Sequence, residues 1–255
     1  MNEIFCAGDI FIMEADVMPK YKRILLKLSG EVLAGDKHIG IDFGTVRDFA
    51  LKLAEIRNAG IELSLVIGGG NMIRGRDSED YGLDRVSLDG IGMLGTVMNA
   101  LAVKTALDSM NVPAKVLSAV AMPPIAELYS RESAREYLRA GNIVMFGAGT
   151  GHPFFSTDTA AALRASELGL DCVVKGTKVD GIYDRDPKKY PDAKFFPELT
   201  YSEAISRNLH VMDTAAFALC RENKIPVWVM NVQDSGAWVK NIIEGANVGT
   251  IVKED

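Results

Sequence analysis

The sequence contains little cysteine or histidine, with three residues of each among 255. Cys6, Cys172 and Cys220 form no CxxC pair, and an odd number of cysteines is typical of a reducing compartment. Neither a cysteine nor a second histidine lies at zinc-site spacing from His152. We therefore expect the cysteines to pack in the core, and we expect no transition-metal centre.

A long basic stretch is also missing, and the net charge is −6. This balance argues against nucleic acid or an anionic membrane as the main partner. We find no apolar run of transmembrane length, and residues 1–16 carry acidic residues where a signal peptide needs positive charge. We predict a cytoplasmic protein with an N-terminal extension over residues 1–19, either disordered or a leader from an upstream start. A single domain over residues 20–255 should follow it.

Strand-like and helix-like patterns alternate through the rest of the chain. Expected strands are Arg23–Leu28, Leu63–Ile67, Ala114–Leu117, Ile143–Phe146, Cys172–Lys175, Pro226–Met230 and Thr250–Lys253. Expected helices include Thr45–Ala59, Asp89–Met110, Ser130–Ala140, one that Ser156 or Thr157 caps, one that Asp213 opens, and Gly236–Ile243; Lys188–Pro197 should be irregular. The alternation predicts an α/β fold, a three-layer αβα sandwich around a mostly parallel sheet.

Four of the expected strands end in residues suited to phosphate groups. They lead into Lys27, Gly68–Gly70, Gly147–Gly151 and Lys175–Thr177. A right-handed crossover makes the first two strands parallel, so their carboxyl ends share one edge of the sheet, where open α/β sheets bind ligands. Glycines let backbone N–H groups approach an anion closely. Lys27 alone could be a surface lysine at a turn and Gly68–Gly70 an ordinary strand-to-helix turn, but a capped helix does not explain the glycines of Gly147–Gly151, and together the four strand ends indicate a phosphate-binding rim.

The familiar nucleotide motifs are nevertheless absent. The sequence has no GxxxxGK[ST] loop, no GxGxxG with a following acid, and no HRD/DFG pair. A Rossmann dehydrogenase is therefore disfavoured. Phosphoryl transfer remains possible, because it needs positioning and charge neutralisation more than covalent chemistry.

The combination of motifs resembles the bacterial UMP kinases of the amino acid kinase superfamily, from Tyr21 to the C-terminus. The matching segments are KLSG at Lys27–Gly30, IGGGNxxRG at Ile67–Gly75, GAGTGxPFFSTD at Gly147–Asp158, KVDGIYDRDP at Lys178–Pro187 and LTYSE at Leu199–Glu203. The resemblance implies transfer of the γ-phosphoryl group of MgATP to UMP in pyrimidine nucleotide biosynthesis. It also implies a homohexamer with GTP as activator and UTP as inhibitor.

The resemblance assigns site residues position by position. It implies that Lys27 steadies the transferring phosphoryl group and that Asp158 and Asp213 orient Lys27 and the metal-bound phosphates. The ATP-facing residues would be Lys27, Leu28, Ser29, Gly30, Gly70, Arg74, Thr177, Tyr183 and Asp186. The UMP-facing residues would be Gly69, Asp89, Thr150, Gly151, His152, Pro153, Phe154, Phe155, Ser156 and Thr157. Magnesium would arrive on the nucleotide phosphates and not in a protein cage.

The chain departs from the family pattern in two places. His152 replaces a common Asn in the loop that approaches uracil, and Lys104, Asp108, Lys115 and Asn142 stand where some relatives have Arg or His contacting GTP. GTP activation therefore stays open. Two other functions also stay open: a superfamily kinase acting on a carboxylate or carbamate, such as acetylglutamate, and a nucleotide-binding regulator without catalysis.

Overall fold

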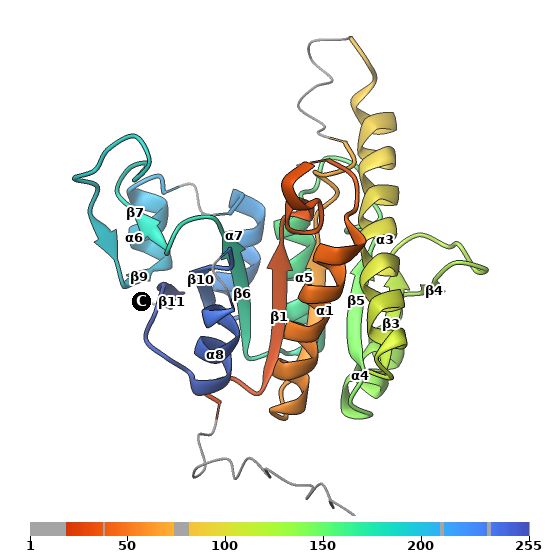
Figure 1. Ribbon diagram of the computed structural model, residues 1–255. Helices are drawn as coiled ribbons and strands as arrows, with labels where there is room; N and C mark the ends of the chain where they lie inside the picture. Colours follow the sequence, from red (N-terminus) through yellow and green to blue (C-terminus); the bar gives the residue numbers. More distant parts are fainter. Residues whose placement is uncertain (1–18, 38, 74–81, 210–211, 234–235, 255) are drawn as a thin grey trace, which may run out of the picture.

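A computed structural model describes residues 19–37, 39–73, 82–209, 212–233 and 236–254. The predicted extension, except Pro19, lies outside the described residues, as do Cys6 and Arg74. The described chain is built around one nine-stranded sheet with helices on both faces (Figure 1). The predicted α/β sandwich is therefore confirmed.

The large sheet has the strand order β4-β3-β5-β2-β1-β6-β10-β11-β9. All of its neighbours pair in parallel except β10 with β11. The strands are β1 Arg23–Leu28, β2 Glu62–Ile67, β3 Ala114–Ser118, β4 Glu127–Leu128, β5 Ile143–Gly147, β6 Cys172–Thr177, β9 Glu198–Thr200, β10 Val227–Asn231 and β11 Thr250–Lys253. A separate antiparallel pair joins β7 Ile182–Tyr183 to β8 Phe195–Phe196.

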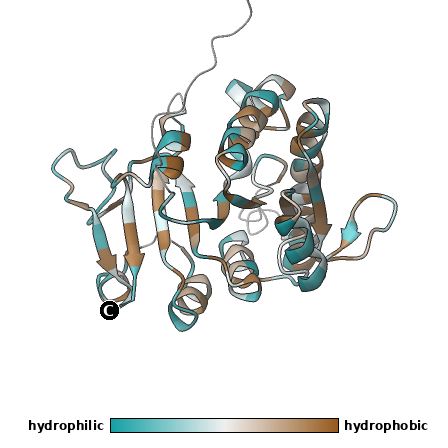
Figure 2. Ribbon diagram, turned by 90° about the horizontal axis from the view of Figure 1, so that it is seen from below, coloured by the Kyte–Doolittle hydropathy of each residue, from teal (hydrophilic) through white to brown (hydrophobic). Residues whose placement is uncertain are grey.

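Two hydrophobic layers cover the faces of the sheet. One contains α1 Phe43–Asn58, α3 Arg85–Ser109 and α8 Ala237–Glu244. The other contains α4 Arg131–Arg139, α5 Thr157–Leu168, α6 Tyr201–Ser206 and α7 Thr214–Glu222. Seen from below, the strands run between helices on both sides (Figure 2).

Most predicted elements are found within two residues of their predicted bounds. The largest shift is in α3, which begins at Arg85 because the Asp84 side chain accepts a hydrogen bond from the Ser87 N–H and caps the helix. The short strands β4, β7, β8 and β9 were not predicted, and β8 lies within the segment Lys188–Pro197 that we expected to be irregular.

Alternation along β1 determines which way its lysine points. Ile24, Leu26 and Leu28 pack in the α1/α3/α8 layer, whereas Leu25 packs in the layer containing α5. Side chains two residues apart share a face of a strand, so Lys27 lies on the Leu25 side, toward α5.

One described helix, α3, is long and apolar enough, by length and composition alone, to cross a membrane. The sequence analysis found no apolar run of transmembrane length, so it did not predict that α3 would meet these criteria. Core helices of globular proteins meet the same criteria, and α3 packs against α1, β3 and β5. We therefore interpret α3 as part of the core.

Candidate active site

The four predicted phosphate-binding strand ends lie side by side. They follow β5, β2, β1 and β6, which are consecutive in the sheet and parallel to one another. Their carboxyl ends therefore meet at one edge, the upper edge of the sheet in Figure 1. The predicted convergence of the four strand ends is confirmed, and its centre is the end of β1.

Three charged side chains form a buried group at this centre. Lys27 Nζ lies 2.6 Å from Asp158 Oδ1, and Lys175 Nζ lies 2.7 Å from Asp158 Oδ2. Lys27 and Lys175 are direct neighbours in the β1–β6 register, and both reach the first turn of α5, where Asp158 stands. All three side chains are only 12–13% exposed. One carboxylate thus holds two ammonium groups at adjacent strand ends.

The environment changes the pKa values of this group. Burial acts to raise the pKa of Asp158, but the Lys27 and Lys175 ammonium groups outweigh it, so this pKa lies below its ordinary value. Burial lowers the pKa of Lys175, Asp158 partly opposes that shift, and Lys27 adds to it. Asp158 is therefore anionic at neutral pH.

Asp213, the third predicted catalytic residue, lies at the start of α7. Its carboxylate accepts hydrogen bonds from Ser156 Oγ, from Thr159 Oγ1 at 2.8 Å and from the Ala216 N–H at 2.9 Å. It is also close enough to Lys175 to affect its pKa. Asp213 therefore ties α7 to the start of α5 beside the lysines.

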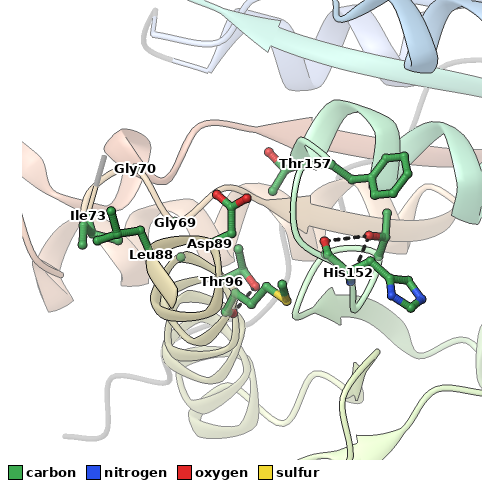
Figure 3. A pocket seen from close by; sticks show the side chains of 13 residues that line it. Gly69, Gly70, Ile73, Leu88, Asp89, Thr96, His152 and Thr157 are labelled. Carbon is green, nitrogen blue, oxygen red and sulfur yellow. Dashed lines mark hydrogen bonds between the residues drawn. The ribbon is translucent and has the colours of Figure 1, made fainter. Parts of the chain in front are cut away.

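A first cavity, of about 140 Å³, opens between the two glycine loops and the start of α3 (Figure 3). Most of the predicted UMP-facing residues line it, together with Gly70, which we had assigned to ATP. The lining residues from the predicted set are Gly69, Gly70, Asp89, Thr150, His152, Phe155 and Thr157. Gly69 permits close contact with α3, because a Cβ there would lie 2.6 Å from the Gly92 carbonyl oxygen.

Asp89 contacts the loop on the opposite wall of this cavity. Its Oδ2 accepts a hydrogen bond of 2.7 Å from the Phe154 N–H, and its Oδ1 lies 2.9 Å from Arg85 Nε. Phe154 is 67% exposed and has a φ of +72°, which L-residues with large side chains rarely adopt. The Arg85 guanidinium lies 5.8 Å from the Phe154 ring centroid. Asp89 thus connects the start of α3 to residues 150–155.

A second cavity, of about 410 Å³, lies beyond the end of β6 and includes the predicted adenosine-binding residues Thr177, Tyr183 and Asp186. Thr177 Oγ1 lies 2.7 Å from the Val179 carbonyl, and the Tyr183 ring packs edge-on against Phe195 at 5.3 Å between centroids. Lys178 Nζ reaches Glu31 Oε2 at 2.6 Å. The segment after β6, whose residues Thr177 and Val179 line the second cavity, is therefore joined to the short 3-10 turn Gly30–Leu33 that follows β1.

The structure refines several sequence-based assignments. Lys175 was noted at a strand end but given no role, and its position beside Lys27 follows from the strand order that the structure shows. The Leu28 side chain is fully buried on the α1 face, so any contact of Leu28 with a ligand must come from its backbone. Arg74 lies outside the described residues.

The described residues contain no group of three or more His, Cys, Asp and Glu side chains arranged to hold a metal ion. Cys172 and Cys220 are buried free thiols, as expected for packing residues. Burial raises the pKa of Cys172 well above its usual range and that of Cys220 to about 12. Both are therefore protonated at neutral pH.

Comparison with known proteins agrees with this geometry. The model of the amino acid kinase family matches residues 22–231. A uridylate kinase of Methylococcus capsulatus is 50% identical over 234 residues, which cover 92% of this chain and 98% of the relative.

Among solved structures, a UMP kinase from Bacillus anthracis is 38% identical with a TM-score of 0.88, covering 92% of this chain and 97% of that one. A UMP kinase from Ureaplasma parvum is 36% identical with a TM-score of 0.86, covering 92% of this chain and all of that one. The chain belongs to the amino acid kinase family and, within it, to the bacterial UMP (uridylate) kinases.

Proposed function

We propose that the chain transfers the γ-phosphoryl group of ATP to UMP, giving UDP and ADP for pyrimidine nucleotide synthesis. The observation that carries this proposal is the position of the Lys27–Asp158–Lys175 group. The first cavity is bordered by the loops after β2 and β5, the second by the loop after β6, and β1 runs between β2 and β6. The buried lysines thus stand between an acceptor site and a donor site.

In this proposal each part of the site has a separate task. Thr177, Tyr183 and Asp186 hold the adenosine half of ATP in the second cavity, and Ser29, Gly30, Gly70 and Arg74 face its phosphates. The residues around the first cavity, with Gly151, Pro153, Phe154 and Ser156 in the same loop, hold UMP. Lys27 and Lys175 neutralise charge on the transferring group, while Asp158 keeps both ammonium groups in place before substrate arrives. No general base is required.

Magnesium belongs to the substrate in this proposal, as MgATP. The oxygens of Asp158 face two lysines, and those of Asp213 accept three hydrogen bonds, so neither carboxylate offers an empty cage. Mg²⁺ commonly keeps several waters and binds substrate phosphates with one or two carboxylates nearby. The metal would neutralise phosphate charge, and Asp213 would orient the metal-bound phosphates.

We also propose a homo-oligomer, a hexamer as in the resembling family. Support comes from α3, where Ile91, Leu94 and Met98 follow helical spacing and are 47–55% exposed. A second copy of the chain would cover such a stripe. We expect light scattering to give a mass above the monomer's 27.7 kDa and Leu94→Glu to lower it. A wild-type monomer would contradict this part of the proposal.

The proposal also covers the location of the enzyme and its regulation by UTP and GTP. We expect a cytoplasmic enzyme. We expect UTP to inhibit it by binding with its uracil in the acceptor site. We expect weak activation by GTP, because Lys104 already pairs with Asp108 at 2.5 Å, and the Lys115 ammonium lies over the Tyr137 ring at 4.8 Å. Titration of GTP and UTP against initial rates tests both expectations.

The decisive experiment measures ADP release from MgATP with UMP, CMP, dUMP, acetylglutamate and carbamate as separate acceptors. We expect selective turnover of UMP. Turnover of a carboxylate or carbamate instead would overturn the assignment of the acceptor loop. No turnover with any acceptor, together with measurable UMP binding, would support a non-catalytic regulator.

A further inference from the structure

Two buried polar side chains on α3 each hold one of the two glycine loops. Thr96 is 4% exposed and Asn99 is fully buried, and they lie three residues apart on one side of the helix. The surrounding helix positions Val97, Ala100 and Val103 are apolar core residues. Packing alone would be satisfied by apolar side chains at positions 96 and 99 as well. Core packing therefore does not explain why Thr96 and Asn99 carry polar side chains.

Asn99 holds the loop after β2 through a reciprocal amide pair. Its Nδ2 donates to the Gly68 carbonyl at 2.8 Å and to Asn71 Oδ1 at 2.7 Å. Asn71 Nδ2 donates back to Asn99 Oδ1 at 3.0 Å and to the Gly40 carbonyl at 2.7 Å. A Cβ on Gly30 would lie 2.1 Å from Asn71 Oδ1, so the turn after β1 also rests on this pair. Both amides are fully engaged and buried.

Thr96 holds the loop after β5. Its Oγ1 accepts a hydrogen bond of 2.8 Å from the Ala148 N–H and donates one of 2.6 Å to the Met93 carbonyl within α3. Ala148 is buried and has a φ of +60°, a left-handed conformation that costs energy for a residue with a Cβ. Thr96 also lines the first cavity, the proposed acceptor site, which we call the acceptor cavity; it lies there between Gly69 and the loop that carries His152 (Figure 3).

We propose that Thr96, Asn99 and Asn71 are positioning residues, through which α3 sets the spacing between the loop at Gly68–Gly70 and the loop at Gly147–Gly151. This inference rests on the proposed phosphoryl transfer to UMP. Both loops line the first cavity, but the first loop also contacts the end of β1 beside Lys27, where the Gly68 N–H donates to the Leu28 carbonyl at 2.9 Å, so loss of the amide pair should lower kcat. The second loop borders only the acceptor cavity, so loss of the Thr96 hydrogen bond should raise the KM for UMP.

Two sets of variants separate positioning from folding. Thr96→Val removes the hydroxyl at nearly constant shape, and we expect roughly a tenfold rise in the KM for UMP, with kcat and the KM for ATP within about twofold. Thr96→Ser keeps the hydroxyl and should restore the KM. Ser64→Ala is the matched control: it removes a buried hydrogen bond of 3.0 Å to the Ile24 carbonyl within the sheet, away from both loops. It should lower stability without changing either KM.

The amide pair is tested by Asn99→Leu and by the double variant Asn71→Leu/Asn99→Leu. The single variant leaves the Asn71 amide buried without the Asn99 amide, whereas the double variant removes both amides. Because the Gly68 and Gly40 carbonyls then lack these donors, the double variant should recover only part of the stability. We expect kcat to stay about 10²-fold low in the double variant, since an error of about 1 Å in positioning costs that much. If the single variant does not fold, the kinetic constants of the double variant and of Thr96→Val still test the inference.

The outcomes distinguish this inference from the proposed function. If the wild type does not phosphorylate UMP, the proposed function fails. If the wild type is active but kcat recovers together with stability in the double variant, the amide pair has only a structural role and the inference is overturned. It is also overturned if Thr96→Val alters the KM values for UMP and ATP equally, or not at all.

Discussion

The charged group Lys27–Asp158–Lys175, which we call the donor end because it faces the donated phosphoryl group in our proposal, and the acceptor end of the site are held in different ways. Between the cavities, Lys27 and Lys175 are buried against one carboxylate, and the strands and helix that carry them belong to the core. At the acceptor end, Phe154 and Phe155 are 67% and 55% exposed, and Phe154 has a positive φ. One end is organised by buried charge, the other by backbone hydrogen bonds to Asp89 and Thr96.

The difference corresponds to what each end must do. Charges that stabilise a transferring phosphoryl group act best when they are fixed beforehand in a site that excludes water. An acceptor loop must admit and release a nucleotide, so its contacts need to be weaker and nearer the surface. Substitutions at the donor end should therefore damage both stability and turnover, and those at the acceptor end should mainly change UMP binding.

The largest effect is expected for Asp158→Asn. The substitution leaves two ammonium groups side by side in a site where all three side chains are 12–13% exposed. Removing one partner of a buried ion pair costs about 3–5 kcal/mol, so the free energy of unfolding in urea should fall by that amount. Asp108→Asn, which breaks the exposed Lys104–Asp108 pair, is the control and should cost at most about 0.5 kcal/mol.

The same variant gives a prediction for pH dependence. The pKa of Asp158 is lower in the folded protein than in the unfolded chain, where it is about 3.9. The carboxylate therefore contributes its full stabilisation above that value and loses it as pH falls through the lower folded pKa. The difference in unfolding free energy between wild type and Asp158→Asn should be constant from pH 7 to about pH 5 and shrink below about pH 4. A difference that does not change with pH would contradict the charge-based explanation.

Lys27→Met should reduce kcat by roughly 10²–10³-fold, as removal of one preorganised charge-stabilising donor does elsewhere. Affinity for UMP, measured by calorimetry, should change little, because Lys27 lies outside the acceptor cavity lining. Lys240→Met, on the exposed side of α8, should have normal kinetics. Near-normal turnover of Lys27→Met would remove Lys27 from the mechanism.

The donor end could largely be predicted from the sequence, because its elements are regular. Period-two alternation places Lys27 opposite the α1 face, and the cap at Ser156 places Asp158 in the first turn of α5. The order of strands could not be predicted, since parallel pairing depends on contacts between distant segments. That order puts Lys175 beside Lys27, a partnership that sequence reasoning missed.

The links between α3 and the loops could not be predicted for a different reason. A helix with apolar residues on nearly all sides has no clear amphipathic face, so its pattern does not show that Thr96 and Asn99 point inward. The strands β4, β7 and β8, of two residues each, carry too few residues for any periodicity.

Asp89→Ala should have a smaller effect, confined to the acceptor end. It removes the acceptor of the Phe154 N–H and the partner of Arg85. A hydrogen bond to a charged group contributes about 1.5–3 kcal/mol, so the KM for UMP should rise at least about tenfold, with the KM for ATP unchanged. Initial rates with each substrate varied in turn give both constants. Equal effects on both substrates would show that the two ends are not independent.

The smallest expected effect is a difference in stability between glycine variants of two neighbouring phenylalanines. Phe154→Gly and Phe155→Gly both remove an exposed ring and both increase the freedom of the unfolded chain. Only at Phe154 does glycine also relieve a left-handed backbone, which costs about 1–2 kcal/mol for a residue with a Cβ. Phe154→Gly should therefore be about 1 kcal/mol more stable to urea than Phe155→Gly. Equal stabilities would mean that the backbone at Phe154 is not strained, and the acceptor loop would then differ less from the donor end than we infer.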